Sequence, residues 1–274
     1  MLGYYFIRFL LLKGLIMIKI FETHAHYDDE AFDVDRDELL KSFNDNGIYA
    51  AVNIGANLES SYIGDKYTKE YDFMYATVGV HPSDIREMEN CDGIKILRDL
   101  ATNNKKIVAI GEIGLDYHYE DTDKPLQKKW FINQLDLARE LKLPVVIHSR
   151  DAAKDTIDIM QEQKANELGG VVHCYSYTKE SAKTFLDMDF FFGIGGVITF
   201  SNAKKLKEAV EYIPLDKIVL ETDSPYLAPV PFRGKRNSSL YIPYIAEAIA
   251  EIKGIDVDTV YEATWNNAKT LYRL

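Results

Sequence analysis

Cysteine is scarce in this sequence of 274 residues, which contains only Cys91 and Cys174. Two isolated thiols cannot form the framework of a disulfide-stabilised secreted domain, and they lack the paired spacing of a zinc ribbon. We therefore expect both cysteines to be reduced thiols in a cytoplasmic protein. Cys174 is expected to be a small core residue.

Long hydrophobic runs are also missing. The most apolar stretch, residues 4–17, contains Arg8 and Lys13 and is shorter than the roughly 20 residues that a transmembrane helix needs. No small-residue cleavage site follows it, which disfavours a signal peptide. Because strand-like sequence follows directly, we expect residues 1–16 to be an N-terminal extension and residues 17–274 to form the folded domain, with no part in a membrane.

Net positive charge is absent as well. The 43 acidic residues outnumber the 32 basic residues and give a formal charge of −11. Such a chain has no general attraction for nucleic acid, whose binding is driven by phosphate neutralisation. A nucleic-acid substrate would have to be held locally, by metal ions and a few basic side chains. No feature of the sequence indicates an obligate protein partner.

Short runs of β-branched and aromatic residues alternate with longer amphipathic segments, a pattern typical of βα units. Most of these runs are almost continuously apolar, as expected for strands that are buried on both faces of a parallel sheet. The runs that we predict to be strands are residues 18–23, 49–54, 74–80, 107–110, 144–147, 170–173, 190–194 and 218–221.

Helical patterns occupy the segments between these strands. Residues 35–46 end before Gly47, a residue type that commonly ends helices. Residues 126–141 place apolar side chains on one helical face, and residues 151–163 and 179–188 follow the next two strands.

Eight strands that are each followed by a helical segment predict an α/β fold, a single-domain (β/α)₈ TIM barrel. A doubly wound open sheet is the alternative, and it usually carries a Gly-rich phosphate loop after its first strand. Here the first strand is followed by His24-Ala25-His26, which favours the barrel.

Residues that commonly bind metals recur at the carboxyl ends of the predicted strands, the rim where TIM barrels carry their catalytic groups. In an extended chain, His24 and His26 project to the same side, so that both imidazoles can reach one ion. Four of the six histidines in the chain lie at strand ends, accompanied by two carboxylates. The candidate metal ligands are His24, His26, Glu112, His148, His173 and Asp223.

Imidazole and carboxylate ligands without a thiolate suit Zn²⁺, Mg²⁺ or Mn²⁺ and indicate a catalytic site. Six ligands exceed what one open catalytic ion needs, so we predict two divalent metal ions that share a hydroxide. Glu112 is placed to bridge the ions. Asp223 can bind one ion and also orient or deprotonate the attacking water. We therefore regard Glu112 and Asp223 as catalytic.

Six segments around these residues follow one another from about Lys19 to the end of the chain: FETHAHYDDEAFDVDRDELL, GVHPSD, GEIGLDYHY, LPVVIHSRDA, GVVHCYS and LETDSPYLAPVPFRGKRN. In sequence and in order they resemble the signature segments of the TatD family of metal-dependent deoxyribonucleases. The resemblance implies a TIM barrel, a two-metal site and hydrolysis of DNA phosphodiesters, usually as an exonuclease acting from the 3′ end.

The resemblance also implies how the ligands divide between the two ions. One ion would be held by His24, His26, Glu112 and Asp223. The other would be held by Glu112, His148 and His173.

Further matched residues are candidates for substrate binding. His81 ends the third strand and would bind a substrate phosphate or orient a metal ligand, although an ordinary turn histidine remains the alternative. Arg150 would bind a phosphate oxygen or pair with a neighbouring loop. Ser224 and Tyr226 would shape the pocket. Arg233 opens the basic loop Arg-Gly-Lys-Arg, which would hold a DNA backbone or lie in solvent. His118 is not expected to bind metal.

Some positions depart from the family pattern, and these departures concern the substrate more than the metals. Glu22 replaces the usual aspartate before Thr23-His24, and Phe232 replaces a common histidine before Arg233. The same ligand set could instead serve a metal-dependent amidohydrolase or deacylase that acts on a small molecule. The basic loop favours phosphate.

Overall fold

The computed structural model describes residues 18–274 of the chain. The expected N-terminal extension, residues 1–16, lies outside the described residues. No helix within residues 18–274 combines the length and the apolar character needed to cross a lipid bilayer.

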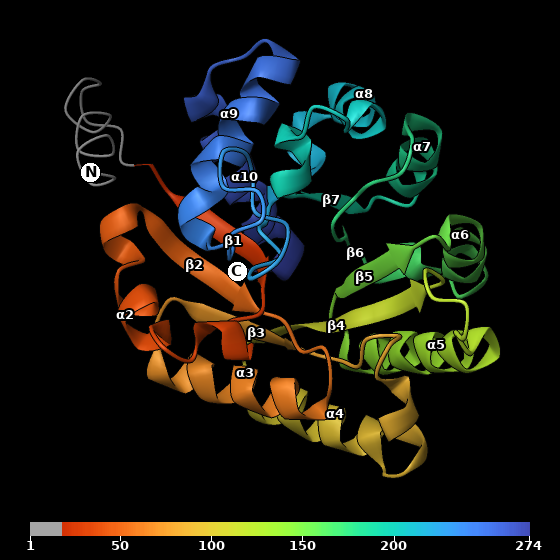
Figure 1. Ribbon diagram of the computed structural model, residues 1–274. Helices are drawn as coiled ribbons and strands as arrows, with labels where there is room; N and C mark the ends of the chain where they lie inside the picture. The colour runs from red at the N-terminus through yellow and green to blue at the C-terminus, as the bar shows by residue number, and fades with distance from the viewer. Residues whose placement is uncertain (1–17) are drawn as a thin grey trace.

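Eight parallel strands follow one another around the molecule in chain order, and helices surround them (Figure 1). This order confirms the predicted (β/α)₈ barrel, because a doubly wound sheet would change direction along the strand order. The strands are β1 (Ile20–Ala25), β2 (Ile48–Asn53), β3 (Met74–Val78), β4 (Ile107–Asp116), β5 (Val145–Arg150), β6 (Gly170–Val172), β7 (Phe191–Ile194) and β8 (Ile218–Leu220).

The barrel closes where β1 meets the segment after β8. Ala25 and Ser224 form an isolated parallel bridge. The backbone N–H of His26 donates to the carbonyl of Ser224 (2.8 Å), and that of Asp223 donates to the carbonyl of His24 (2.9 Å). The first and last strands are therefore joined at their carboxyl ends, through residues predicted to bind metal.

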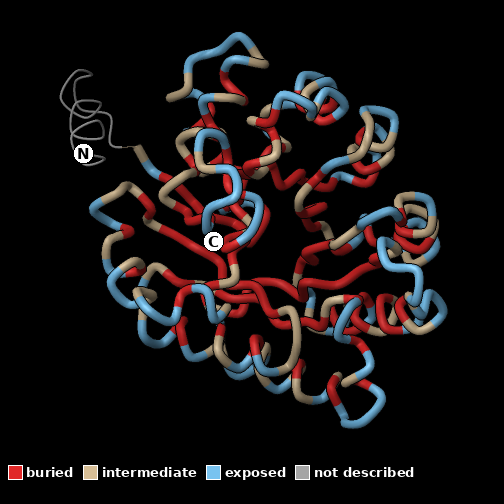
Figure 2. Tube along the Cα trace, in the orientation of Figure 1, coloured by how far each residue is buried: buried red, intermediate tan, exposed pale blue. Residues whose placement is uncertain are grey.

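Helices cover the outside of the strands, and their solvent-facing sides are exposed while the strands are buried (Figure 2). The 3₁₀ turn Asn44–Asn46 and Gly47, with φ of 78°, end the first predicted helical segment. The helices are α2 (Arg36–Lys41), α3 (Leu58–Glu70), α4 (Gly93–Asn103), α5 (Lys124–Leu141), α6 (Ala153–Glu162), α7 (Lys179–Asp187), α8 (Lys204–Tyr212), α9 (Ile242–Lys253) and α10 (Val257–Tyr272).

The barrel interior is filled by a small hydrophobic cluster to which all eight strands contribute. Because strands from opposite sides of the barrel meet in it, this cluster lies inside the ring of strands. Leu271 and Tyr272 of α10 belong to it, and the Tyr272 hydroxyl donates to the carbonyl of Thr23. Val146 and Val171 in this cluster each precede a predicted ligand by two residues, so His148 and His173 project toward the same interior.

Strand β4 is longer than its sequence suggested. Only residues 107–110 were predicted, but β4 continues through Gly111 and Gly114 to Asp116. At Gly114, with φ of 146°, a Cβ atom would collide with the carbonyl oxygen of His148. Glycine therefore allows β4 and β5 to pair closely, and it places Glu112 within a strand rather than after one.

The close pairing at Gly114 leads to a stability prediction. Gly114→Ala should lower the free energy of unfolding by about 3 kcal/mol, from the disfavoured positive φ together with the clash with β5. Gly169→Ala is the matched control, because Gly169 also has positive φ (70°) but has no atom within 4 Å of the added Cβ. It should cost only about 1 kcal/mol. Equal losses in urea unfolding would contradict this account.

Candidate metal centre

The six predicted ligands converge at the carboxyl end of the barrel. His24 belongs to β1, Glu112 to β4 and His148 to β5. His26 and His173 follow directly after β1 and β6, and Asp223 lies in the segment after β8, separated from it by Glu221 and Thr222. His24, Glu112 and His173 are buried, with side chains at most 4% exposed.

One group of ligand atoms surrounds the end of β1. The Nε2 atoms of His24 and His26 lie 3.3 Å apart. Nε2 of His24 lies 3.4 Å from Oε2 of Glu112, and Nε2 of His26 lies 3.5 Å from Oδ1 of Asp223. Bond lengths of about 2.0–2.1 Å around a tetrahedral Zn²⁺ place neighbouring ligand atoms roughly 3.3 Å apart. The spacing of these donors therefore fits a cation among them.

A second group surrounds the other oxygen of Glu112. Oε1 lies 2.7 Å from Nδ1 of His148 and 3.6 Å from Nε2 of His173. The two oxygens of Glu112 thus face different sets of histidines. This is the arrangement expected of a carboxylate shared by two cation positions.

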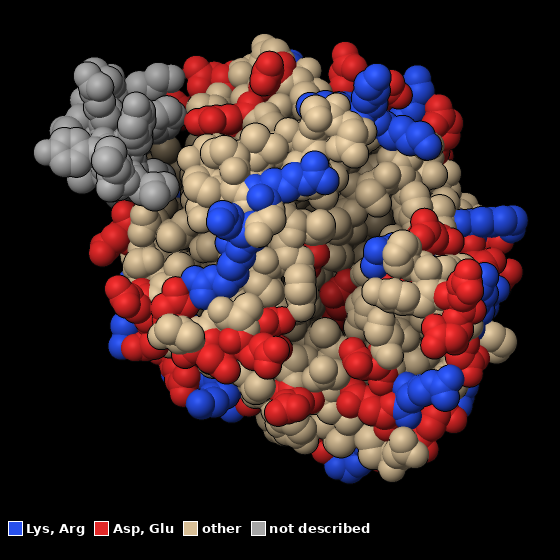
Figure 3. Space-filling model, in the orientation of Figure 1, with Lys and Arg blue, Asp and Glu red and all other residues tan. Residues whose placement is uncertain are grey.

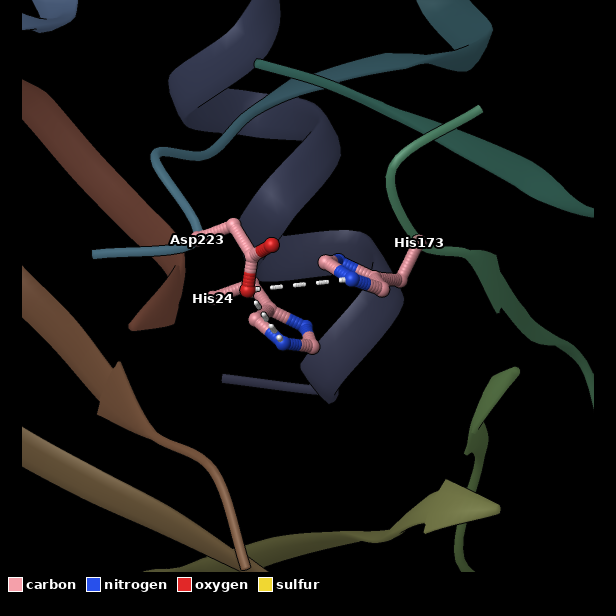
Figure 4. Close-up of side chains that lie close together, drawn as sticks. All are labelled: His24, His173 and Asp223. Atoms are coloured by element: carbon pink, nitrogen blue, oxygen red, sulfur yellow. Dashed lines mark ion pairs between the residues drawn. The ribbon is translucent and has the colours of Figure 1, made fainter. Parts of the chain in front are cut away.

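Asp223 lies between the two groups. Figure 4 shows its carboxylate pointing toward both His24 and His173, whose rings stack with centroids 3.5 Å apart. Oδ1 lies 3.7 Å from Nε2 of His24 and 3.9 Å from Nε2 of His173. Asp223 has a φ of 57°, and its carbonyl accepts the N–H of Tyr226. This turn directs the carboxylate into the barrel mouth.

The pKa values of these groups show how strongly the carboxylates attract positive charge. Burial disfavours the charged form of His26, but its hydrogen bond to Asp223 and the nearby carboxylates outweigh burial and raise its pKa to about 9. For His173, burial is outweighed by Glu221, Glu112 and Asp223, and the pKa rises to about 10. Burial alone would raise the pKa of Glu112, yet His173 and His24 hold it well below its usual value.

His24 and His81 behave in the opposite way. Burial, followed by repulsion from neighbouring histidines, lowers the pKa of both side chains, to about 3 for His81. Nδ1 of His24 is buried without a hydrogen-bond partner. These imidazoles are therefore neutral, which is the form that binds metal.

Two buried carboxylates that sequence reasoning missed support the ligands. Oε1 of Glu221 lies 3.0 Å from Nδ1 of His173 and accepts the N–H of Cys174 at 2.7 Å. Oδ2 of Asp116 lies 3.2 Å from Nε2 of His148. The even spacing of Glu112 and Asp116 could have revealed Asp116, since alternate residues of a strand share a face and both carboxylates would then point into the barrel. It was hidden because β4 was predicted to end at residue 110.

Glu22 supports the ligands through their backbone. Its carboxylate accepts hydrogen bonds from the N–H groups of His24 and Thr222 and from the hydroxyls of Thr222 and Ser239. Burial raises the pKa of Glu22 to about 7. This departure from the family pattern therefore lies behind the ligands and does not face them.

Cys174 differs from the expectation of a core residue. It is half-buried with φ of 45°, and its sulfur lies within 4.8 Å of a ligand atom of His173 and of Glu221. The positive φ turns the chain after β6 so that Cys174 stays near the metal centre. Burial raises the pKa of its thiol well above the usual range. His118, which was not expected to bind metal, pairs with Asp151 at 3.0 Å on the surface.

His81 and Arg150 lie at the same mouth. Nε2 of His81 is 4.0 Å from Oε1 of Glu112, and its ring packs edge to face on His148. Arg150 is exposed, and its guanidinium lies 5.9 Å from the ring centroid of Tyr119.

The predicted substrate residues after β8 have different surroundings. Tyr226 is 53% exposed and donates its hydroxyl to Asp29. Arg233 is exposed and lies over Phe200. Ser224 is fully buried, and its hydroxyl bonds to Thr222. Ser224 therefore supports the turn after Asp223. Its prediction as a substrate-binding residue is corrected, because a fully buried side chain cannot contact a substrate.

A barrel whose mouth gathers imidazoles and carboxylates in this way belongs to the class of metal-dependent hydrolases. The comparisons with known proteins agree. The sequence profile of a family described as "TatD related DNase" matches residues 21–273. The chain belongs to this family.

Individual relatives cover nearly the whole chain. It is 41% identical to the "Uncharacterized metal-dependent hydrolase YabD" of Bacillus subtilis, over 93% of this chain and 99% of that protein. It is 36% identical to the "Uncharacterized metal-dependent hydrolase YcfH" of Escherichia coli, over 92% and 95%. The crystal structure of YjjV, a TatD homolog from Escherichia coli, superposes with a TM-score of 0.87 at 26% identity, covering 94% of this chain and all of that one.

The raised pKa values lead to a prediction about metal uptake. Below about pH 9 the metal-free protein holds protons on His26 and His173, and a cation must displace them. The pKa of His148 is raised as well, by Asp116 and Glu112 against the effect of burial. Binding of Mn²⁺ at pH 7.5 should therefore release protons, and the affinity should increase as pH rises toward 9. Calorimetric titration in buffers with different ionisation enthalpies measures the release. His118→Ala should leave it unchanged, and uptake without proton release would contradict the prediction.

Proposed function

We propose that this protein hydrolyses phosphodiester bonds of DNA through a hydroxide activated by two divalent metal ions, and that it acts as an exonuclease from the 3′ end. The observation that carries the proposal is the division of the Glu112 oxygens between two sets of histidines. Zn²⁺, Mg²⁺ and Mn²⁺ are the candidate ions.

The chain's own residues have distinct roles in this reaction. His24, His26, Glu112 and Asp223 would hold one ion, and Glu112, His148 and His173 the other. When bound, the pair of ions polarises the phosphoryl group and lowers the pKa of a water molecule. Asp223 would orient the attacking water and accept its proton, because its Oδ1 faces both groups of ligands.

The surroundings of the mouth favour an anionic substrate despite the acidic total charge. Lys and Arg side chains form a band beside the hollow at the centre of this face, where acidic atoms are visible (Figure 3). In the basic loop, Arg236 pairs with Asp35 through two contacts of 2.6 Å. Arg233 and Lys235 are exposed, so we assign them, together with Arg150, to the DNA backbone.

The proposed chemistry predicts a loss of turnover on removal of the shared carboxylate. Glu112→Ala should lower kcat on 3′-labelled single-stranded DNA by at least about 100-fold, because both groups of ligands lose a donor. Asp223→Asn should lower kcat by a similar factor through loss of the proton acceptor.

A substrate comparison tests the reaction class. Metal-reconstituted protein is assayed on labelled DNA, on amides and on lactones, with Lys105→Ala as a surface control at the opposite end of the barrel. Turnover of amides with DNA left intact would identify a metal-dependent amidohydrolase or deacylase instead.

The basic loop predicts the salt dependence of DNA cleavage. Replacing Arg233 and Lys235 by Ala should raise KM for oligonucleotides. It should also reduce the slope of log(kcat/KM) against log salt by about 1.4, since each of the two phosphate contacts on a single strand contributes about 0.7. Lys105→Ala, which removes one positive charge before β4 at the far end of the barrel, should change neither quantity. An unchanged slope in the double variant would remove the loop from DNA binding.

A further inference from the structure

A cavity of about 230 Å³ opens beside the metal centre, between the segments that follow β3 and β4. Asp116 lines the cavity and also contacts His148, with 3.2 Å between Oδ2 and Nε2. Pro82, on the opposite wall, directly follows His81. A molecule whose reacting phosphate lies among the metal ligands can therefore extend into this cavity.

Gln127 holds the two walls of the cavity together. It is buried in α5, and its amide donates to the carbonyl of Pro82 (3.2 Å) while its oxygen accepts the N–H of Asp116 (2.9 Å). Because one side chain links both segments, the cavity exists before a ligand binds.

The lining of the cavity selects against anions. Asp116, Asp121 and Asp123 contribute carboxylates, and the one cation in the lining, Arg86, lies 4.0 Å from Asp123. A phosphate would be repelled here, whereas a neutral group with N–H or O–H donors would meet hydrogen-bond acceptors. Leu126 adds an apolar surface. This combination suits a base and its sugar.

Tyr119 supplies an aromatic surface at the edge of the cavity. It lines the cavity and is 58% exposed. Bases stack on such rings without strong sequence preference. The Arg150 guanidinium lies 5.9 Å from the ring centroid, so a phosphate contact and a stacking surface lie next to each other.

We propose that this cavity binds the nucleoside next to the scissile phosphate, with its base stacked on Tyr119. The inference rests on the proposed phosphodiesterase function and adds a specificity-determining residue to it. At 230 Å³ the cavity is smaller than the about 300–1,000 Å³ of pockets for drug-sized ligands. It accommodates one unpaired nucleoside and excludes a base pair, so the substrate end must be single-stranded or frayed.

The test compares two chromogenic diesters on the metal-loaded full-length protein. Thymidine 5′-(p-nitrophenyl phosphate) carries a nucleoside, and bis(p-nitrophenyl) phosphate does not. The measured quantity is the ratio of their kcat/KM values. Tyr119→Ala should lower this ratio about tenfold, as expected for the loss of one stacking contact, mainly through KM of the nucleoside substrate.

Two control variants define the result. Tyr119→Phe keeps the stacking surface and should keep the ratio. Tyr212→Ala removes a comparably exposed tyrosine (47%) at the end of α8 and should keep it too. A ratio that Tyr119→Ala leaves unchanged, or a wild-type ratio near one, overturns this inference alone. Failure of the wild-type protein to cleave either diester overturns the phosphodiesterase function, and this inference with it.

Discussion

The closure of the barrel between β1 and the segment after β8 is the constraint on which the metal centre depends. The two hydrogen bonds that make this closure involve His24, His26 and Asp223 themselves. Glu22 reinforces the closure from behind by accepting the N–H groups of His24 and Thr222. The ends of the first and last strands are therefore held together, and the contacts that close the barrel also place His24, His26 and Asp223 beside one another.

The buried carboxylates of the ligand cluster require positive charge beside them. Buried carboxylates such as Glu112 and Asp223 are stable only when positive groups compensate them. In the metal-free protein that compensation comes from protons on His26 and His173, which a cation replaces. Glu221 and Asp116 orient the histidines from outside the cluster. Such outer contacts tune both metal affinity and the basicity of the ligands.

Sequence reasoning was most accurate where a single periodicity dominates. Apolar runs predicted all eight strands in order. Parallel strands are buried on both faces, so nearly all of their side chains are apolar. It was wrong about the end of β4, which continues through Gly111 and Gly114 because these glycines allow close pairing with β5. Asp116 was lost through the same error. Ser224 and Cys174 were misplaced because backbone turns after β8 and β6 decide where their side chains lie.

The sequence by itself determined the barrel, the family and the ligand types, because strand periodicity and the order of the motifs are local properties of the chain. Only the tertiary structure decided which oxygen of Glu112 faces which histidines, and which carboxylates hold the imidazoles in place. It also decided that a cavity lined by Tyr119 adjoins the ligands. These relations depend on strand register and closure, which bring together residues as distant in the chain as His24 and Asp223.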